Sequence, residues 1–82
     1  MKMQNITVLE KVDGEMIENV YTPELLKNVK LGEFLTLRPG GSIKYVRGAY
    51  DKSAKKYQVD AWNKGADKLL KSNQIVYINF TY

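Results

Sequence analysis

Aromatic and basic side chains are interleaved within residues 43–62 in a pattern typical of proteins that bind single-stranded nucleic acid. The segment reads I-K-Y-V-R-G-A-Y, then D-K-S-A-K-K, then Y-Q-V-D-A-W. Aromatic rings stack on unpaired bases, while lysine and arginine contact the phosphates. A basic two-stranded ribbon can alternatively enter the major groove of a duplex. The candidate contact residues are Lys44, Tyr45, Arg47, Lys52, Lys55, Lys56 and Trp62.

A β-hairpin must position these side chains, because two alternating runs are joined by a short polar loop. We place Tyr50 opposite Tyr57, which leaves a six-residue connection whose ends, Asp51 and Lys56, can pair. Opposed residue numbers in a regular antiparallel pair sum to a constant. This one pair therefore predicts the register of the whole hairpin.

The predicted register sorts the side chains into two faces. Arg47 falls opposite Asp60 and Tyr45 opposite Trp62, and we expect this face to be exposed. An alternative remains open, because Arg47 and Asp60 can form an ordinary cross-strand ion pair and another element can cover the two rings. The face expected to cover the core carries Val46, Gly48, Tyr50, Tyr57, Val59 and Ala61.

The composition argues against an enzyme. The 82 residues are enough for one domain and include neither Cys nor His, so the commonest general base and metal ligand is missing. Asp51 and Asp60 lie at opposite ends of the second strand of the hairpin, and no nucleotide, metal or nucleophile motif occurs. We therefore predict a protein that is not an enzyme and has no cofactor.

The charge is unevenly distributed along the chain. The net charge is +4, yet the first 24 residues carry five acids and two lysines, whereas the remainder carries four acids and eleven bases. The excess can simply maintain solubility, or it can attract a polyanion such as nucleic acid. The uneven distribution favours the second interpretation.

Nothing in the sequence predicts insertion into a membrane. The N-terminal run M-K-M-Q-N-I-T-V lacks the apolar stretch of a signal peptide, and no segment approaches the length of a membrane span. The predicted location is the cytoplasm.

A first hairpin is predicted over residues 6–21, with Asp13-Gly14 at its turn. Asp-Gly between alternating runs is a strong hairpin signal. A three-residue loop would pair Val8 with Val20 and keep apolar side chains together. We prefer it to a two-residue loop, which would mix the faces.

Two short helices are expected between the strands. Thr22 and Pro23 are residue types that cap and start a helix, and Gly32 would end it. The second helix is expected over residues 65–71.

The remaining strands are expected over residues 33–38 and 74–82, with Val76, Ile78 and Phe80 on one face of an interior strand. The predicted fold is a single α+β domain in the order ββαβββαβ. It consists of a mostly antiparallel sheet of about six strands with two helices on one side.

Parts of the chain resemble small uncharacterised proteins of bacterial mobile elements, such as conjugative transposons and plasmids. The similar segments are F-L-T-L-R-P at 34–39, Y-V-R-G-A-Y-D-K-S-A-K-K-Y at 45–57 and V-Y-I-N-F-T-Y at 76–82, about a third of the chain. In such proteins a polar segment containing Cys and Asp follows the second tyrosine. Here residues 58–65 read Q-V-D-A-W-N-K-G instead. The resemblance implies plasmid transfer, replication accessory work, regulation or interference with host defence as the setting, and it implies no particular activity.

Two hypotheses follow, with a third for self-association. The first is a nucleic-acid-binding accessory or regulatory protein that prefers single strands, for which Trp62→Ala should weaken binding. The second is an interaction module that binds a protein partner through the same face or through the acidic first hairpin. The third is a homodimer that pairs at an edge strand.

Overall fold

The chain folds into two antiparallel β-sheets. The computed structural model describes residues 4–41, 43–62 and 65–81, and seven strands lie within these ranges. One sheet has the order β1-β2-β7 and the other β3-β4-β5-β6. The bounds are β1 (Ile6–Val12), β2 (Glu15–Leu25), β3 (Phe34–Leu35), β4 (Tyr45–Asp51), β5 (Lys56–Ala61), β6 (Lys68–Lys71) and β7 (Ile75–Ile78).

The predicted α+β fold is wrong, because both expected helices are replaced by other structure. The only helical element among the described residues is the 3-10 turn η1 (Leu26–Asn28). Pro23, expected to start a helix, lies in β2 opposite Tyr77 of β7. A strand accepts proline at an edge, and β1 pairs with β2 only as far as Tyr21. Sheet pairing with a distant segment thus overrides the local helix signals.

The second expected helix, over residues 65–71, contains β6 instead. Leu70 pairs with Tyr57, and Leu69, which lies opposite Gln58, points to the other face. Four residues are too few for their periodicity to separate a helix from a strand. The described part of the chain therefore has seven strands where the sequence predicted about six strands and two helices.

The first hairpin is confirmed, but its register differs from the one predicted. Asp13 and Gly14 both have positive φ, 52° and 82°, which is the pattern of a two-residue type I′ turn. Val8 therefore pairs with Asn19 instead of Val20. The buried Asn19 is tolerated on the inner face because its side chain bonds the backbone of Thr81: Oδ1 accepts from Thr81 N at 2.7 Å, and Nδ2 donates to Thr81 O at 2.7 Å.

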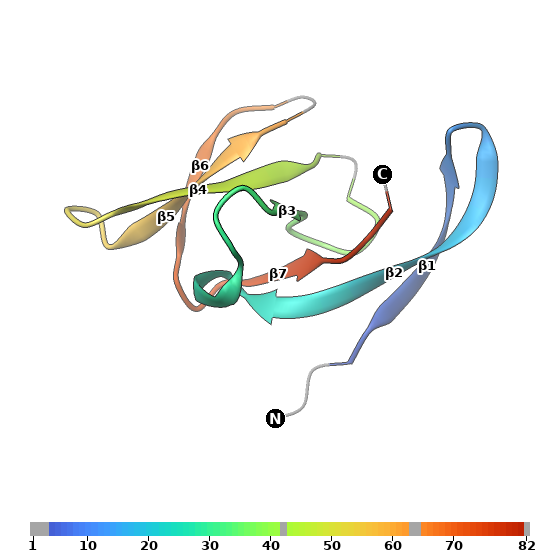
Figure 1. The fold of residues 1–82 in the computed structure, drawn as a ribbon, viewed down its shortest axis with the longest axis horizontal. Coiled ribbons are helices and arrows are strands. Elements are labelled where there is room, and N and C mark those ends of the chain that lie inside the picture. The colour runs from blue at the N-terminus through green and yellow to red at the C-terminus, as the bar shows by residue number, and fades with distance from the viewer. Residues whose placement is uncertain (1–3, 42, 63–64, 82) are drawn as a thin grey trace.

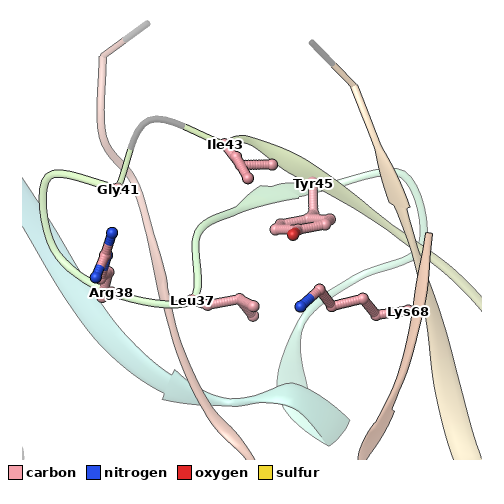
Figure 2. Close-up of a pocket in the computed structure, with 6 residues that line it drawn as sticks. All are labelled: Leu37, Arg38, Gly41, Ile43, Tyr45 and Lys68. Carbon is pink, nitrogen blue, oxygen red and sulfur yellow. The ribbon is translucent and has the colours of Figure 1, made fainter. Parts of the chain in front are cut away.

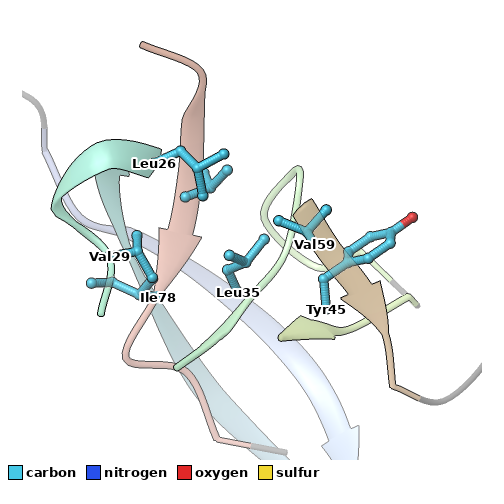
Figure 3. Close-up of a cluster of buried hydrophobic side chains, with 7 residues drawn as sticks. Leu26, Val29, Leu35, Tyr45, Val59 and Ile78 are labelled. Atoms are coloured by element: carbon cyan, nitrogen blue, oxygen red, sulfur yellow. The ribbon is translucent and has the colours of Figure 1, made fainter. Parts of the chain in front are cut away.

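The hydrophobic core lies between the two sheets (Figure 3). Reciprocal hydrogen bonds of 2.9 Å between Thr36 and Tyr77 join β7 to the segment that follows β3. Val76, Ile78 and Phe80 are buried, but the interior strand predicted over residues 74–82 is wrong, because β7 ends at Ile78 and is the last strand in the order of its sheet. Tyr82 of the predicted strand lies outside the described residues. The core cluster consists of Leu26, Val29, Leu35, Tyr45, Val59, Val76 and Ile78.

The molecule is flat, with principal dimensions of 43 × 32 × 15 Å. The turn between β1 and β2 and the turn between β4 and β5 lie at opposite ends of the long axis (Figure 1). The acidic and the basic hairpins therefore present their tips to different regions of solvent.

Candidate nucleic-acid interface

The β4–β5 hairpin begins with the predicted register and then departs from it. Tyr50 pairs with Tyr57 and Asp51 with Lys56, as expected. Between Arg47 and Tyr50 the register shifts by one residue, so that Gly48 and Ala49 together face a single residue of β5. Such a shift is a β-bulge, and it moves every earlier side chain of its strand to the opposite face.

The bulge places the backbone of Gly48 against that of β5. A Cβ added at Gly48 would lie 3.1 Å from the carbonyl oxygen of Gln58, closer than ordinary packing allows. Glycine within an otherwise regular strand is a known signal of a bulge or of close backbone approach. This signal was present in the sequence, and following it would have corrected the register.

The predicted exposed face is wrong for the first strand of the hairpin. Tyr45 lies opposite Ala61 rather than Trp62, and its side chain is only 2% exposed within the core. Arg47 lies opposite Val59 rather than Asp60, so the proposed Arg47–Asp60 pairing does not occur. The two predicted contact residues in β4 therefore lie on the inner face of the sheet.

Arg47 joins two tyrosines on the inner face, at the edge of the core. Its guanidinium carbon lies 4.3 Å from the centroid of the Tyr57 ring, a cation–π arrangement. The Tyr50 and Tyr57 rings are 4.8 Å apart, and Tyr50 is 43% exposed. The Arg47 Nε atom is buried without a hydrogen-bond partner among the described residues. The sequence assigned both tyrosines to the core, which holds for Tyr57, packed against the core cluster, but not for the exposed Tyr50. The grouping of Arg47 with these two rings was not predicted.

The predicted loop lysines surround the tip of the same hairpin. Lys52 and Lys55 are exposed and Lys56 is half-buried. The tip is ordered by Asp51, whose Oδ1 accepts hydrogen bonds from Ser53 N at 3.0 Å, Ser53 Oγ at 2.7 Å and Ala54 N at 3.2 Å. The bond from the Ser53 side chain and those from the backbone lower the pKa of Asp51. Its charge is thus directed at the turn, and the lysines are held on a defined loop.

A further lysine, not predicted from the sequence, lies beside the tip. Lys71 of β6 is directly opposite Lys56 of β5, so the two side chains share a face. Like charges in this position are destabilising. The sequence could not reveal the pair, because residues 65–71 were expected to form a helix. We call the group formed by Arg47, Tyr50, Lys52, Lys55, Lys56, Tyr57 and Lys71 the basic tip.

Trp62 and Lys44 lie at the other end of the hairpin. Trp62 is 60% exposed, and its ring meets Phe34 edge to face at 5.4 Å. The two residues are neighbours across the strands, since Trp62 N donates to Lys44 O at 2.8 Å. With the turn region of the first hairpin they line an open hollow of about 570 Å³.

Lys44 is mostly occupied by contacts within the protein. Its Nζ donates to Gly41 O at 2.7 Å and lies 5.1 Å from the centroid of the Phe80 ring. Burial lowers the pKa of Lys44, and the charge of Glu10 opposes that shift. Of the seven predicted contact residues, four meet at the basic tip, Tyr45 is in the core, and Lys44 and Trp62 form a separate site.

The described residues form neither a metal-binding cluster nor a membrane-spanning helix. Within residues 4–41, 43–62 and 65–81, no group of three or more metal-binding side chains could hold a metal ion. No helix in these same ranges has the length and apolar character needed to cross a membrane.

Comparisons with known proteins contribute no further assignment. The chain matches no protein-family model, no curated protein and no solved structure. The resemblance to proteins of mobile elements therefore stays a prediction.

Proposed function

We propose that the chain binds single-stranded nucleic acid at the basic tip. The observation that carries this proposal is the packing of Arg47 against two tyrosines at the end of a hairpin whose tip carries three lysines, with Lys71 on the neighbouring strand. Base stacking on an aromatic side chain contributes roughly 1–3 kcal/mol per base, and surrounding cations contact the phosphates. The exposed ring of Tyr50 supplies a stacking surface. Lys52 and Lys55 lie on the loop, and Lys56 and Lys71 lie on the opposite face of the neighbouring strands β5 and β6.

The opposed lysines support the same function. Lys56 and Lys71 repel each other in the free protein, and a bound phosphate would neutralise both. Binding would also release the counterions condensed on the nucleic acid, which makes the affinity depend on salt. The cost of this lysine pair is thus offset when an anionic strand is bound.

A titration of fluorescently labelled oligonucleotides, followed by anisotropy at low ionic strength, tests the proposal. We expect single strands of DNA or RNA to bind more tightly than a duplex of the same length. The logarithm of the binding constant should fall linearly with the logarithm of the salt concentration, with a slope of about −0.7 per phosphate contacted. Absence of binding to single strands at low salt would overturn the proposal.

A charge-matched pair of variants distinguishes local contacts from the overall charge. Changing Lys52, Lys55 and Lys56 to Glu should abolish binding. The same change at Lys11, Lys27 and Lys30, which are exposed and lie outside the basic tip, alters the net charge equally. Equal losses in the two triple variants would show that only the net charge matters.

Protein binding through the first hairpin is a second candidate, favoured by one observation. The outer face of β1 and β2 exposes Leu9, Met16 and Val20, which are 66%, 60% and 40% exposed. Glu18 lies opposite Leu9 on this face. Exposed apolar side chains gathered on one face are typical of interaction surfaces.

A pull-down from nuclease-treated lysate separates the two candidates. A partner that is retained by the native chain and lost when Leu9 and Met16 are changed to Ser supports protein binding. A partner that vanishes with nuclease supports nucleic-acid binding instead. Light scattering of the purified chain tests the predicted homodimer.

The proposed role is that of an accessory or regulatory protein without catalytic activity, acting in the cytoplasm. A mobile genetic element is the proposed setting, and it rests on the partial sequence resemblance alone.

A further inference from the structure

A second concave site lies away from the basic tip, between the loop that follows β3 and the strands β4 and β6. It is a hollow of about 300 Å³, close to the lower limit for small-molecule pockets. The described residues that line it are Leu37, Arg38, Gly41, Ile43, Tyr45 and Lys68 (Figure 2).

The hydroxyl group of Tyr45 gives this hollow a polar atom. Tyr45 lines the hollow although its side chain is only 2% exposed. Figure 2 shows the hydroxyl oxygen directed into the space between Ile43 and Lys68. A ligand in the hollow would hydrogen-bond to this hydroxyl group, which both donates and accepts.

Two cations line the hollow on opposite sides, with Arg38 drawn beside Gly41 in Figure 2. Arg38 belongs to the loop, whereas Lys68 starts β6 and shares the inner face of the sheet with Val59. Among the described lining residues none is acidic, so both charges are available to an anion. Arginine binds phosphate and carboxylate through two parallel N–H groups, and lysine adds a point charge.

The remaining walls are apolar. Leu37 and Ile43 contribute side chains, while Gly41 contributes only backbone. Because two sides carry polar donors and the other sides are apolar, the hollow favours a ligand that has both an anionic group and an apolar part. We propose that the hollow binds a small oxyanion, a phosphate or carboxylate group, carried on an apolar body about the size of one ring.

Titration of the ¹⁵N-labelled chain with phenyl phosphate, followed by amide chemical shifts, tests this proposal. We expect saturable shifts at Leu37, Ile43, Tyr45 and Lys68. Benzoate in a parallel titration distinguishes carboxylate from phosphate as the preferred group. Benzyl alcohol, a neutral molecule of similar size, should bind at least about tenfold more weakly because it cannot pair with either cation.

Variants of the lining residues identify the contacts. Tyr45→Phe removes one oxygen from the core and should weaken phenyl phosphate binding about fivefold, the effect of one hydrogen bond. Arg38→Gln and Lys68→Gln should each weaken it by at least as much. Lys27→Gln removes an exposed charge outside both the hollow and the basic tip, and it should have no effect.

The results that would contradict anion binding in the hollow differ from those that would contradict nucleic-acid binding at the basic tip. Shifts confined to residues 51–56, absence of saturation, or unchanged affinity in Tyr45→Phe would each exclude the hollow as the binding site. The triple lysine-to-glutamate variant of the tip should bind phenyl phosphate like the native chain. A loss in that variant would place the anion at the basic tip instead.

Discussion

Gly48 lies so close to Gln58 that any side chain at position 48 would press a Cβ to within 3.1 Å of the carbonyl oxygen at position 58. This approach accompanies the bulge that turns Tyr45 into the core and Arg47 onto Tyr57. The arrangement of the basic tip therefore depends on a residue that has no side chain.

Replacing Gly48 with Ala should lower the free energy of unfolding by about 1–3 kcal/mol, because the backbone of β5 must move to accept the methyl group. Urea unfolding followed by circular dichroism measures this effect. Ala49→Ser changes the exposed neighbour and serves as the control. Equal stability of the Gly48→Ala variant and the native chain would mean that the strand relaxes without cost.

Asn19 and Thr81 should be energetically coupled through their two hydrogen bonds. Asn19→Ala leaves the Thr81 N–H and carbonyl without these partners, and we expect the free energy of unfolding to fall by about 1–3 kcal/mol. Hydrogen exchange at the Thr81 amide should also become faster. The exposed Asn5→Ala is the matched control. An unchanged exchange rate at Thr81 would contradict the prediction.

Variants of Tyr50 and Trp62 distinguish the basic tip from the binding face that the sequence predicted, which included Trp62. Tyr50→Ala should weaken binding of a short single strand by about 1–3 kcal/mol, or roughly five- to 150-fold, because it removes the exposed stacking surface of the basic tip. Trp62→Ala should leave this affinity unchanged, since Trp62 lies at the opposite end of the hairpin. Anisotropy titration of both variants measures these affinities. A loss of affinity in Trp62→Ala and none in Tyr50→Ala would place the binding site at Trp62.

The alkaline stability of the chain should depend on Tyr21. Its side chain is fully buried, and its hydroxyl donates a hydrogen bond to Glu10. Burial, and then the hydrogen bond and charge of Glu10, raise the pKa of Tyr21 above the ordinary value of about 10. Above about pH 10 the unfolded chain loses this proton and the folded chain keeps it, so the free energy of unfolding falls as the pH rises.

Urea unfolding of the native chain and Tyr21→Phe at several pH values between about 8.5 and 11 measures this effect. Phenylalanine cannot ionise, so the variant should be less stable at neutral pH and should lose less stability above about pH 10. Tyr50→Phe, at a side chain that is 43% exposed, is the control. Parallel curves for the native chain and Tyr21→Phe would contradict the assigned direction.

Local signals in the sequence were sufficient for the hairpins and insufficient for their registers. Asp13 and Gly14 located the first turn correctly, because an Asp-Gly pair adopts positive φ at both positions with little strain. The register depended on Asn19, whose hydrogen-bond partner Thr81 lies 62 residues further along the chain. No local pattern indicates that such a polar residue can be buried.

The errors in secondary structure have the same origin. Thr22 and Pro23 are ordinary helix-starting residues, but they pair with Ile78 and Tyr77 of a distant strand. Leu69 and Leu70 fit either a helix or a strand, and only their pairing with β5 decides. For the candidate site, the lysines of the tip were correctly predicted to be neighbours. The aromatic partners of Arg47 were not predicted, because the bulge moves Arg47 to the face that carries Tyr50 and Tyr57.

The order of the strands also constrains how the chain assembles. The sheet β3-β4-β5-β6 is built from strands that follow one another directly, so each pairing closes only a short loop. The pairing of β2 with β7 instead brings together Leu25 and Ile75. Loop-closure entropy rises with the length of chain enclosed, so the β2–β7 pairing is disfavoured until the intervening segment has become compact. We therefore expect the sheet that carries the basic tip to form early and to act as the template on which the other sheet is completed.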